Sequence, residues 1–213
     1  MQQFNLAKVK LQGLIHKLPM LANLDRVDVL ITSYPRSGLS WFRCLLAGYI
    51  YGDDVWLGNV QDYIPSLGDD LWKPKKIKFK IIGSHSEARI IKKLKPETKI
   101  IFIFRDEGST DSYYRAFQVR YNVKITKEFF KKWVYKDYAY PLPRDRFLNE
   151  WKFNYGLCLV YPFSVLDIKK ALEYIGYDVD DDRLEKVYNK FTKDKMREMQ
   201  NIINPKNLAV SYA

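Results

Sequence analysis

The sequence predicts an α/β fold, a single domain in which an open parallel sheet is flanked by helices. Four short apolar runs have the composition of buried strands, at residues 27–32, 77–82, 99–104 and 157–161. Helical patterns separate these runs, and this alternation is typical of a parallel sheet. The 213 residues contain no repeat and no linker rich in Gly, Pro or Ser, so we assign residues 1–213 to one domain.

Residues 1–24 precede the first strand and are predicted to form a helical segment that packs on the domain. Their apolar side chains recur roughly on one side of a helix, namely Phe4, Leu11, Leu14, Ile15 and Leu18. Lys and polar residues interrupt every apolar stretch here, so we predict no signal peptide. The sequence has no apolar run of about 20 residues, which predicts no membrane span. We therefore expect a cytoplasmic protein in a reducing compartment.

Two further helices are predicted from the spacing of apolar residues. Aromatic residues and leucines repeat at helical spacing over residues 41–50, directly after the first strand. Another helix is predicted over residues 167–175, ending at Gly176. Cys44 and Cys158 both lie in apolar stretches, so we expect two buried thiols and no disulfide framework.

The chain is strongly basic, with 36 Lys and Arg against 25 Asp and Glu and a net charge of +11. A surplus of this size favours an anionic partner, which is a nucleic acid, a membrane surface, or a phosphorylated or sulfated small molecule. A solvated, Lys-rich surface has the same composition, so charge alone does not choose among these.

The end of the first strand has the features of an anion-binding site. Ligands of open parallel sheets bind at the carboxyl ends of the strands, and the first strand runs into the string SYPRSGLSW at residues 33–41. A tight turn before a helix directs backbone N–H groups and the helix dipole at an anion. Arg36 adds a permanent charge and several N–H donors. The alternative is an ordinary strand–helix turn with an exposed arginine.

Polar residues also follow the second and third strands. His85 comes after Gly83 and Ser84 and is one of only two histidines, so it is a candidate general base, although a lone histidine is more often structural. Arg105 closes the third run, and the segment DEGSTDSYYR follows it. Ser109 or Thr110 would cap the next helix there, a structural role compatible with a binding role for the loop.

The first of these loops resembles the 5′-phosphosulfate loop of the PAPS-dependent sulfotransferases, where PAPS is 3′-phosphoadenosine 5′-phosphosulfate. The family pattern is Tyr-Pro-Lys-Ser-Gly-Thr-Thr-Trp. The matching residues are Tyr34, Pro35, Ser37, Gly38 and Trp41, while Arg36 replaces the usual Lys and Leu39 and Ser40 replace two Thr. The resemblance spans about residues 27–200, is strongest at this loop, and implies a P-loop-like sulfotransferase fold.

The resemblance assigns roles at the other strand ends. It implies that Arg105 and Ser112 bind the 3′-phosphate, although this loop is one residue shorter and more acidic than the family's. His85 stands where the family has its catalytic base in a Lys-Thr-His string, whose Lys is missing here. Tyr161 takes the place of a Tyr near the adenine, or is a core or surface Tyr. Trp41 would stack on the adenine or be a core residue of its helix.

The family's C-terminal Arg-Lys-Gly loop, which closes over the 3′-phosphate, has no counterpart in the sequence. Lys193, Lys195 or Lys206 would have to replace it. The acceptor pocket is expected in residues 51–72 and 117–146, which are rich in aromatic and basic side chains.

The resemblance therefore predicts transfer of a sulfuryl group from PAPS to a hydroxyl or amine of a small-molecule or glycan acceptor. His85 would take the acceptor proton and Arg36 would stabilise the departing phosphate, and no metal is expected. One alternative is a P-loop-like kinase, which needs a Lys directly after the glycine where this chain has Leu39. The other is a basic nucleic-acid-binding module using segments such as KKIKFK, whereas the sulfotransferase prediction involves no nucleic acid.

Overall fold

The computed structural model describes Leu24 and residues 27–66, 81–86, 88–106, 111–115, 118, 124–130 and 144–203. The helix predicted over residues 1–24 lies outside the described residues except for Leu24. Much of the predicted acceptor region, residues 67–72, 119–123 and 131–143, also lies outside them.

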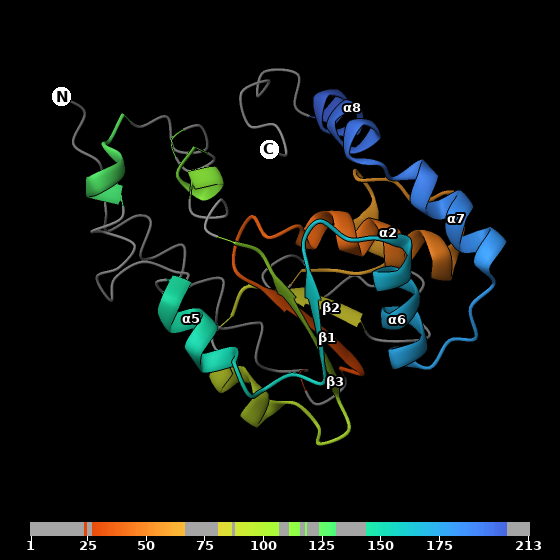
Figure 1. Cartoon of the computed structure of the whole chain (residues 1–213), viewed down its shortest axis with the longest axis horizontal. Coiled ribbons are helices and arrows are strands. Elements are labelled where there is room, and N and C mark those ends of the chain that lie inside the picture. The colour runs from red at the N-terminus through yellow and green to blue at the C-terminus, as the bar shows by residue number, and fades with distance from the viewer. Residues whose placement is uncertain are drawn as a thin grey trace.

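A four-stranded parallel sheet forms the centre of the molecule, as the sequence predicted (Figure 1). Its strands, in chain order, are β1 (Val29–Ser33), β2 (Ile81–Ser84), β3 (Lys99–Phe104) and β4 (Leu157–Val160). Their spatial order is β2-β1-β3-β4, so β1 and β3 are the central strands. In the register of the sheet, Val29 pairs with both Ile81 and Lys99.

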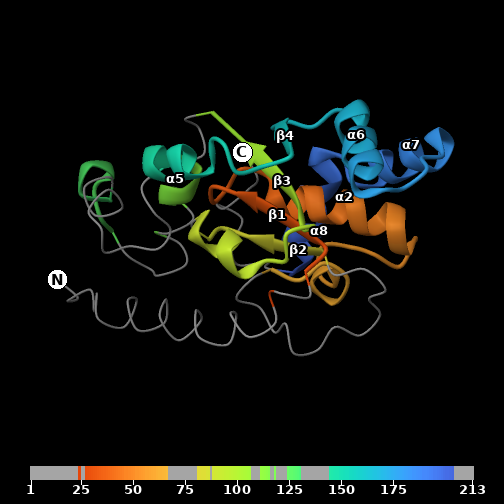
Figure 2. The same cartoon turned by 90° about the horizontal axis from the view of Figure 1, so that it is seen from below.

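Helices cover both faces of this sheet, and the side chains of each strand point alternately to one face and the other. Val29 and Ile31 of β1 belong to the larger core cluster, which also contains residues of α2, α6, α7 and α8, whereas Leu30 belongs to a second cluster with residues of α5. Figure 2 shows α5 and α2 at different sides of the sheet. The helices are α2 (Leu39–Tyr51), α5 (Arg144–Trp151), α6 (Val165–Ile175), α7 (Asp181–Lys190) and α8 (Lys193–Ile203), with 3₁₀ turns η3 (Val60–Asp62) and η4 (Ala88–Lys93).

The two predicted helices are present, and their ends follow from their caps. The helix predicted over residues 41–50 is α2. The helix predicted over residues 167–175 is α6, which starts two residues earlier because Ser164 and Asp167 form a reciprocal capping box. It ends where Gly176 takes a left-handed conformation with φ 103°.

Two predictions are corrected by the sheet. The second strand was expected over residues 77–82, but β2 continues through Gly83 and Ser84, so these residues belong to the strand and not to a loop; residues 77–80 lie outside the described part. Cys158 was expected to be buried, but it is exposed, because β4 is an edge strand of the sheet. Cys44 is buried as expected, and burial raises the pKa of its thiol to about 12.

No helix among the residues that the structure describes is both long enough and apolar enough to cross a bilayer.

Candidate functional site

The parallel sheet brings all four sequence-predicted loops to one edge. Because its strands run in the same direction, their carboxyl ends at Ser33, Ser84, Phe104 and Val160 all lie at that edge. The next residues in the chain are Tyr34, His85, Arg105 and Tyr161, four of the predicted site residues. The topology alone therefore places them in one region.

The loop between β1 and α2 has a strained backbone of the kind found at anion sites. The amide of Ser37 donates to the carbonyl of Tyr34 at 3.2 Å, closing a tight turn in which Arg36 has φ 68°. A positive φ is unusual for a residue other than Gly and costs roughly 1–3 kcal/mol. Gly38, with φ 92°, is the N-cap residue of α2 and has no side chain that could accept hydrogen bonds from the first amides of the helix. These N–H groups suit an anion.

A buried hydroxyl further supports an oxyanion at this loop. The hydroxyl of Ser37 is buried, at 1% exposure, and has no hydrogen-bond partner among the described residues. A buried hydroxyl normally has a partner, so this group fits a ligand oxygen. Gly38 also lies close to the ring of Tyr161: a Cβ at this position would come within 2.5 Å of the ring.

Hydrogen bonds join the first loop to the third. The Nε of Arg36 donates to the hydroxyl of Ser112 at 3.3 Å, and Nη1 of Arg105 donates to the carbonyl of Arg36 at 2.9 Å. The guanidinium of Arg105 also lies 4.7 Å from the centre of the Tyr161 ring. The structure thus gathers four predicted residues, Arg36, Arg105, Ser112 and Tyr161, into one connected cluster. Ser112 lies in a helical stretch, residues 111–115, as predicted; Ser109 and Thr110 lie outside the described residues.

His85 contacts the end of β1 through one ring nitrogen. Its Nδ1 lies 2.8 Å from the carbonyl oxygen of Ser33 and 3.4 Å from the hydroxyl of the same residue. A carbonyl oxygen only accepts hydrogen bonds, so Nδ1 carries the proton in this contact. In the neutral imidazole the lone pair is then on Nε2, so Nε2 is the nitrogen that could accept a proton.

The remaining predicted residues of the first loop are mostly buried. Tyr34 packs edge-on against the ring of Phe147 in α5, and the side chains of Pro35 and Leu39 are buried while Ser40 is half-buried. Trp41 is 6% exposed, donates its ring N–H to the carbonyl of Phe191, and packs on aromatic side chains of later elements, namely Tyr161, Phe163 and Tyr188. Of its two predicted roles, the structure shows packing in the core.

Two buried arginines were not singled out in the sequence. Arg43 in α2 donates to the carbonyl of Ile64 and to Ser66, and so ties the segment after η3 to the helix. That segment adjoins β2 through a bridge between Ser66 and Gly83. Arg144 at the start of α5 donates from Nη2 to the carbonyl of Arg105 at 2.9 Å. Arg43 interrupts the apolar pattern of α2, which was a usable signal, whereas no sequence pattern marks Arg144.

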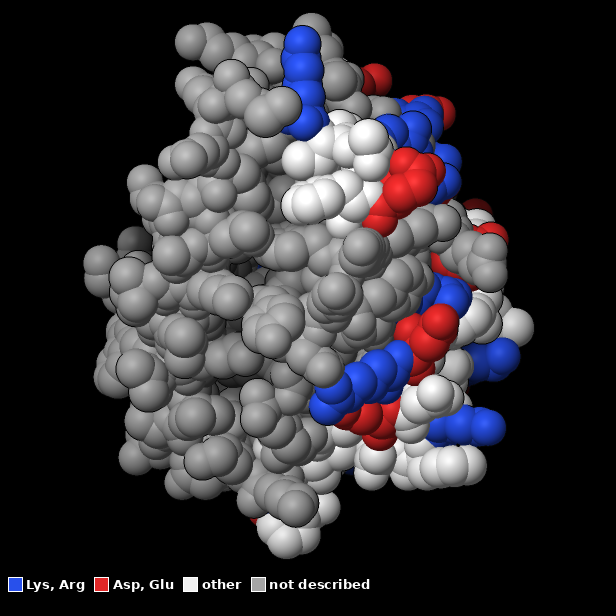
Figure 3. All heavy atoms as spheres, turned by 90° about the vertical axis from the view of Figure 1, so that its left-hand side faces the viewer, with Lys and Arg blue, Asp and Glu red and all other residues white. Residues whose placement is uncertain are grey.

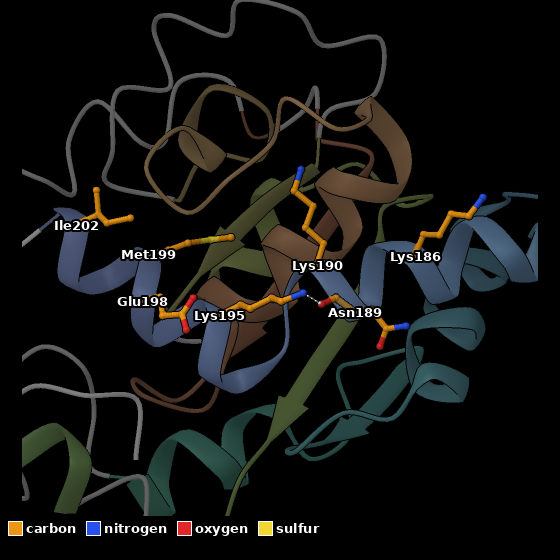
Figure 4. A pocket seen from close by; sticks show the side chains of 7 residues that line it. All are labelled: Lys186, Asn189, Lys190, Lys195, Glu198, Met199 and Ile202. Carbon is orange, nitrogen blue, oxygen red and sulfur yellow. Dashed lines mark hydrogen bonds between the residues drawn. The ribbon is translucent and has the colours of Figure 1, made fainter.

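A groove with a volume of about 570 Å³ lies along α7 and α8 (Figure 4). None of the strand-end residues described above lines it. Its lining consists of Lys186, Asn189, Lys190, Lys195, Glu198, Met199 and Ile202, and so includes Lys195, one of the residues predicted to replace the missing C-terminal loop. The described side chains contain no group of three or more His, Cys, Asp or Glu placed to hold a metal ion.

The basic surplus does not form a continuous patch on the described part of the face in Figure 3. There, Lys and Arg side chains lie next to Asp and Glu side chains. The described residues of this face therefore show mixed charge and not the basic stripe that is typical of a nucleic-acid interface.

Known proteins resemble this chain in fold but not in sequence. No protein-family model matches it, and no curated protein matches it significantly. A solved structure of mouse sulfotransferase SULT7A1 complexed with PAP superposes with a TM-score of 0.65 at 18% identity, covering 86% of this chain and 73% of that one.

Two structures of retinol dehydratase superpose with slightly lower TM-scores. The complex with androsterone and the inactive cofactor PAP has a TM-score of 0.62 at 14% identity, over 87% of this chain and 71% of that one. The complex with retinol and PAP has a TM-score of 0.62 at 12% identity, over 90% and 75%. The predicted fold is therefore confirmed: the chain has an α/β sulfotransferase fold.

Proposed function

We propose that the protein is a sulfotransferase that uses PAPS and releases PAP, and that the acceptor is a hydroxyl or amine of a small molecule or glycan. The observation that carries this proposal is the direct link between the two anion-binding loops, through Arg36 to Ser112 and Arg105 to the Arg36 carbonyl. Two linked phosphate sites at one sheet edge suit a nucleotide with a phosphate at each end of its ribose. The structural relatives were solved with PAP, which is such a nucleotide.

The residues of the first loop fit the 5′-phosphosulfate group. The amides at the start of α2, the buried hydroxyl of Ser37 and the guanidinium of Arg36 would hold its oxygens. Arg105 and Ser112 would hold the 3′-phosphate. Tyr161, stacked against Arg105, would lie beside the adenine.

PAPS supplies an activated sulfuryl group, whose S–O bond to the 5′-phosphate breaks as a bond from sulfur to the acceptor forms. His85 accepts the acceptor's proton on Nε2, because the Ser33 carbonyl holds the proton on Nδ1. The Ser33 contact also fixes the orientation of the ring. Arg36 stabilises negative charge on the departing phosphate as a fixed cation, since an arginine does not release a proton near neutral pH. Positioning and charge stabilisation supply the rate enhancement, as in phosphoryl transfer.

Thermal unfolding with added nucleotides tests this proposal. PAP should stabilise the protein strongly, by about 2.7 kcal/mol at a hundred times its Kd. ATP with Mg²⁺ should stabilise it weakly, because it lacks a 3′-phosphate for Arg105 and Ser112. Equal stabilisation by the two ligands would favour the kinase alternative. Binding of DNA or RNA with a steep salt dependence, and without an effect of PAP, would favour the nucleic-acid alternative.

Incubation with PAPS labelled in its sulfuryl group, and pools of hydroxyl metabolites and glycans, then identifies the acceptor class. Transfer of label to any pool that depends on His85 supports the proposed reaction. PAP binding without label transfer to any pool would leave a nucleotide-binding protein and refute the acceptor classes named here.

A further inference from the structure

Arg144, in the first turn of α5, is a buried cation that the proposed mechanism does not use. It is 9% exposed, and its guanidinium lies 5.7 Å from the centre of the Phe104 ring. Its Nη2 donates to the carbonyl of Arg105, at the carboxyl end of β3. Its Nε is buried and has no hydrogen-bond partner among the described residues. One N–H donor of this side chain is therefore unsatisfied among the described residues.

Among the residues that the structure describes, the neighbours of Arg144 compensate its charge only weakly. The amino end of a helix is its positive end, so the dipole of α5 opposes a cation in the first turn. An ion pair with Asp145 spans 3.7 Å, but the side chain of Asp145 is 77% exposed, and such a pair contributes little in water. A buried charge without strong compensation is costly. An anion bound here would offset that cost.

The side chain of Arg144 bonds to the backbone of Arg105 but has other side-chain neighbours than Arg105. Phe104 and Arg105 are consecutive, so their side chains leave the strand end on opposite sides. The side chain of Arg105 contacts Arg36 and Tyr161, whereas Arg144 lies beside the ring of Phe104. Phe104 packs with the core cluster that contains Phe147 of α5, and not with the cluster that contains α2. The guanidinium of Arg144 therefore lies beside the ring of Phe104, whereas the guanidinium of Arg105 lies beside the ring of Tyr161.

The other end of α5 contacts the loop that carries the proposed base. Trp151 donates its ring N–H to the carbonyl of Ser86 at 3.0 Å, and Glu150 accepts from the amide of Ala88 at 3.3 Å. One helix thus extends from the end of β3, where Arg144 lies, to the segment directly after His85. A molecule that presents its hydroxyl to His85 and passes along the start of α5 would bring a second group to Arg144.

We propose that Arg144 binds a negatively charged group of the acceptor, such as a carboxylate, and that the enzyme selects acidic acceptors. This inference rests on the proposed sulfotransferase function. It assigns Arg144 to acceptor specificity, without contact to the 3′-phosphate.

Isothermal titration of PAP-saturated protein tests the inference without requiring turnover. The probes are 4-hydroxyphenylacetate and its neutral isostere 4-hydroxyphenylacetamide. The wild type should bind the acid about 10- to 100-fold more tightly, as expected for a hydrogen bond between charged groups. Arg144→Gln should remove this preference and leave the affinity for the amide unchanged, and Arg144→Lys should retain part of it. Arg146→Gln, which changes an exposed arginine on the same helix, is the matched control and should bind as the wild type does.

Each other outcome overturns a distinct statement. If PAP itself does not bind the wild type, the proposed function fails. If PAP binds but the wild type binds acid and amide equally, or shows no binding of the acid, the inference about Arg144 fails. If Arg144→Gln weakens binding of acid and amide alike, its role is structural. If that variant loses affinity for PAP but not for adenosine 5′-phosphate, Arg144 binds the 3′-phosphate and the acceptor assignment is wrong.

Discussion

The carboxyl edge of the sheet and the groove along α7 and α8 both gather basic side chains, but they hold them differently. At the sheet edge, Arg36, Arg105 and Arg144 each make hydrogen bonds that join one loop or element to another. In the groove, Lys190 of α7 donates to the carbonyl of Asp53, and Lys195 of α8 donates to the carbonyl of Asn189 in the adjacent α7 (Figure 4). The edge arginines therefore connect the strand-end loops to one another, whereas the groove lysines bond to single carbonyls outside those loops.

The difference shows that a large cavity does not by itself identify a functional site. The groove has a volume of about 570 Å³. The edge instead has the left-handed backbone of Arg36 and the buried hydroxyl of Ser37, two features that cost stability in the absence of a ligand. Proteins keep such features mainly where binding or catalysis uses them. The predictions below test whether the edge carries the function and the groove does not.

The largest effect should come from His85→Ala at the edge. Turnover should fall by about 10²–10⁴-fold, because a general base is lost. PAP affinity should stay nearly unchanged, since the contacts of His85 described above are with Ser33 at the end of β1. Label transfer from PAPS measures the first quantity and calorimetry the second, with His16→Ala as the control for loss of the chain's other histidine. Loss of PAP binding as well as turnover would make His85 a structural residue.

Arg36→Ala and Arg105→Ala compare the two proposed phosphate sites within the edge. Arg36→Ala should weaken both PAP affinity and turnover, because the proposed contacts of Arg36 exist before and during transfer. Arg105→Ala should mainly weaken PAP affinity and leave turnover at saturating PAPS close to that of the wild type, because the 3′-phosphate does not react. Identical effects of the two variants on turnover at saturation would remove the distinction between a reacting and an anchoring phosphate site.

The next largest effect should come from Gly38→Ala in the first loop. A left-handed residue with a Cβ costs about 1–2 kcal/mol, and here the Cβ would also meet the ring of Tyr161 at 2.5 Å. We expect a loss of thermal stability together with a clear fall in PAP affinity. Gly176→Ala is the matched control, because its φ of 103° and ψ of 22° resemble the 92° and 10° of Gly38 while its nearest neighbour is the flexible end of Lys99 at 3.8 Å.

The control should lose stability through backbone strain alone and bind PAP as the wild type does. If Gly38→Ala also kept full PAP affinity, the loop conformation would not matter for the nucleotide and the first loop would be an ordinary turn.

Much of the fold could be predicted because its signals are local. The apolar runs predicted the four strands of the sheet, and Gly176 predicted the end of α6, whereas its start was missed by two residues. Gly83 was placed after the second strand because the apolar run ends at residue 82. In the structure this Gly lies within β2 where Arg43 crosses it, and a Cβ would come within 3.0 Å of the Arg43 side chain. A close approach between distant segments explains this Gly, and no local pattern indicates it.

The candidate site could be predicted only in part, because some of its features depend on contacts between distant segments. The residues at the strand ends follow from topology, because parallel strands bring their carboxyl ends together. Arg144 was missed because its burial depends on packing against Phe104 and Arg105, which are about forty positions away in the sequence. Cys158 was misjudged because an edge strand has the same apolar composition as a central one. The order of the strands decides its exposure, and the sequence pattern does not determine that order.

The smallest effect should come from Lys195→Ala in the groove. Lys195 was one of the residues predicted to replace the missing C-terminal loop, so it is the sharpest test of whether the groove belongs to the nucleotide site. Its ammonium donates to the carbonyl of Asn189 at 2.8 Å in an exposed setting, and such a contact contributes little to stability. We expect the free energy of unfolding to change by less than about 0.5 kcal/mol, with PAP affinity and turnover unchanged.

Denaturant unfolding and calorimetry measure these quantities, and Lys186→Ala, elsewhere in the same groove, is the control. A ten-fold or larger loss of PAP affinity in Lys195→Ala alone would show that α8 contributes to the nucleotide site, and the separation of edge from groove would then be wrong.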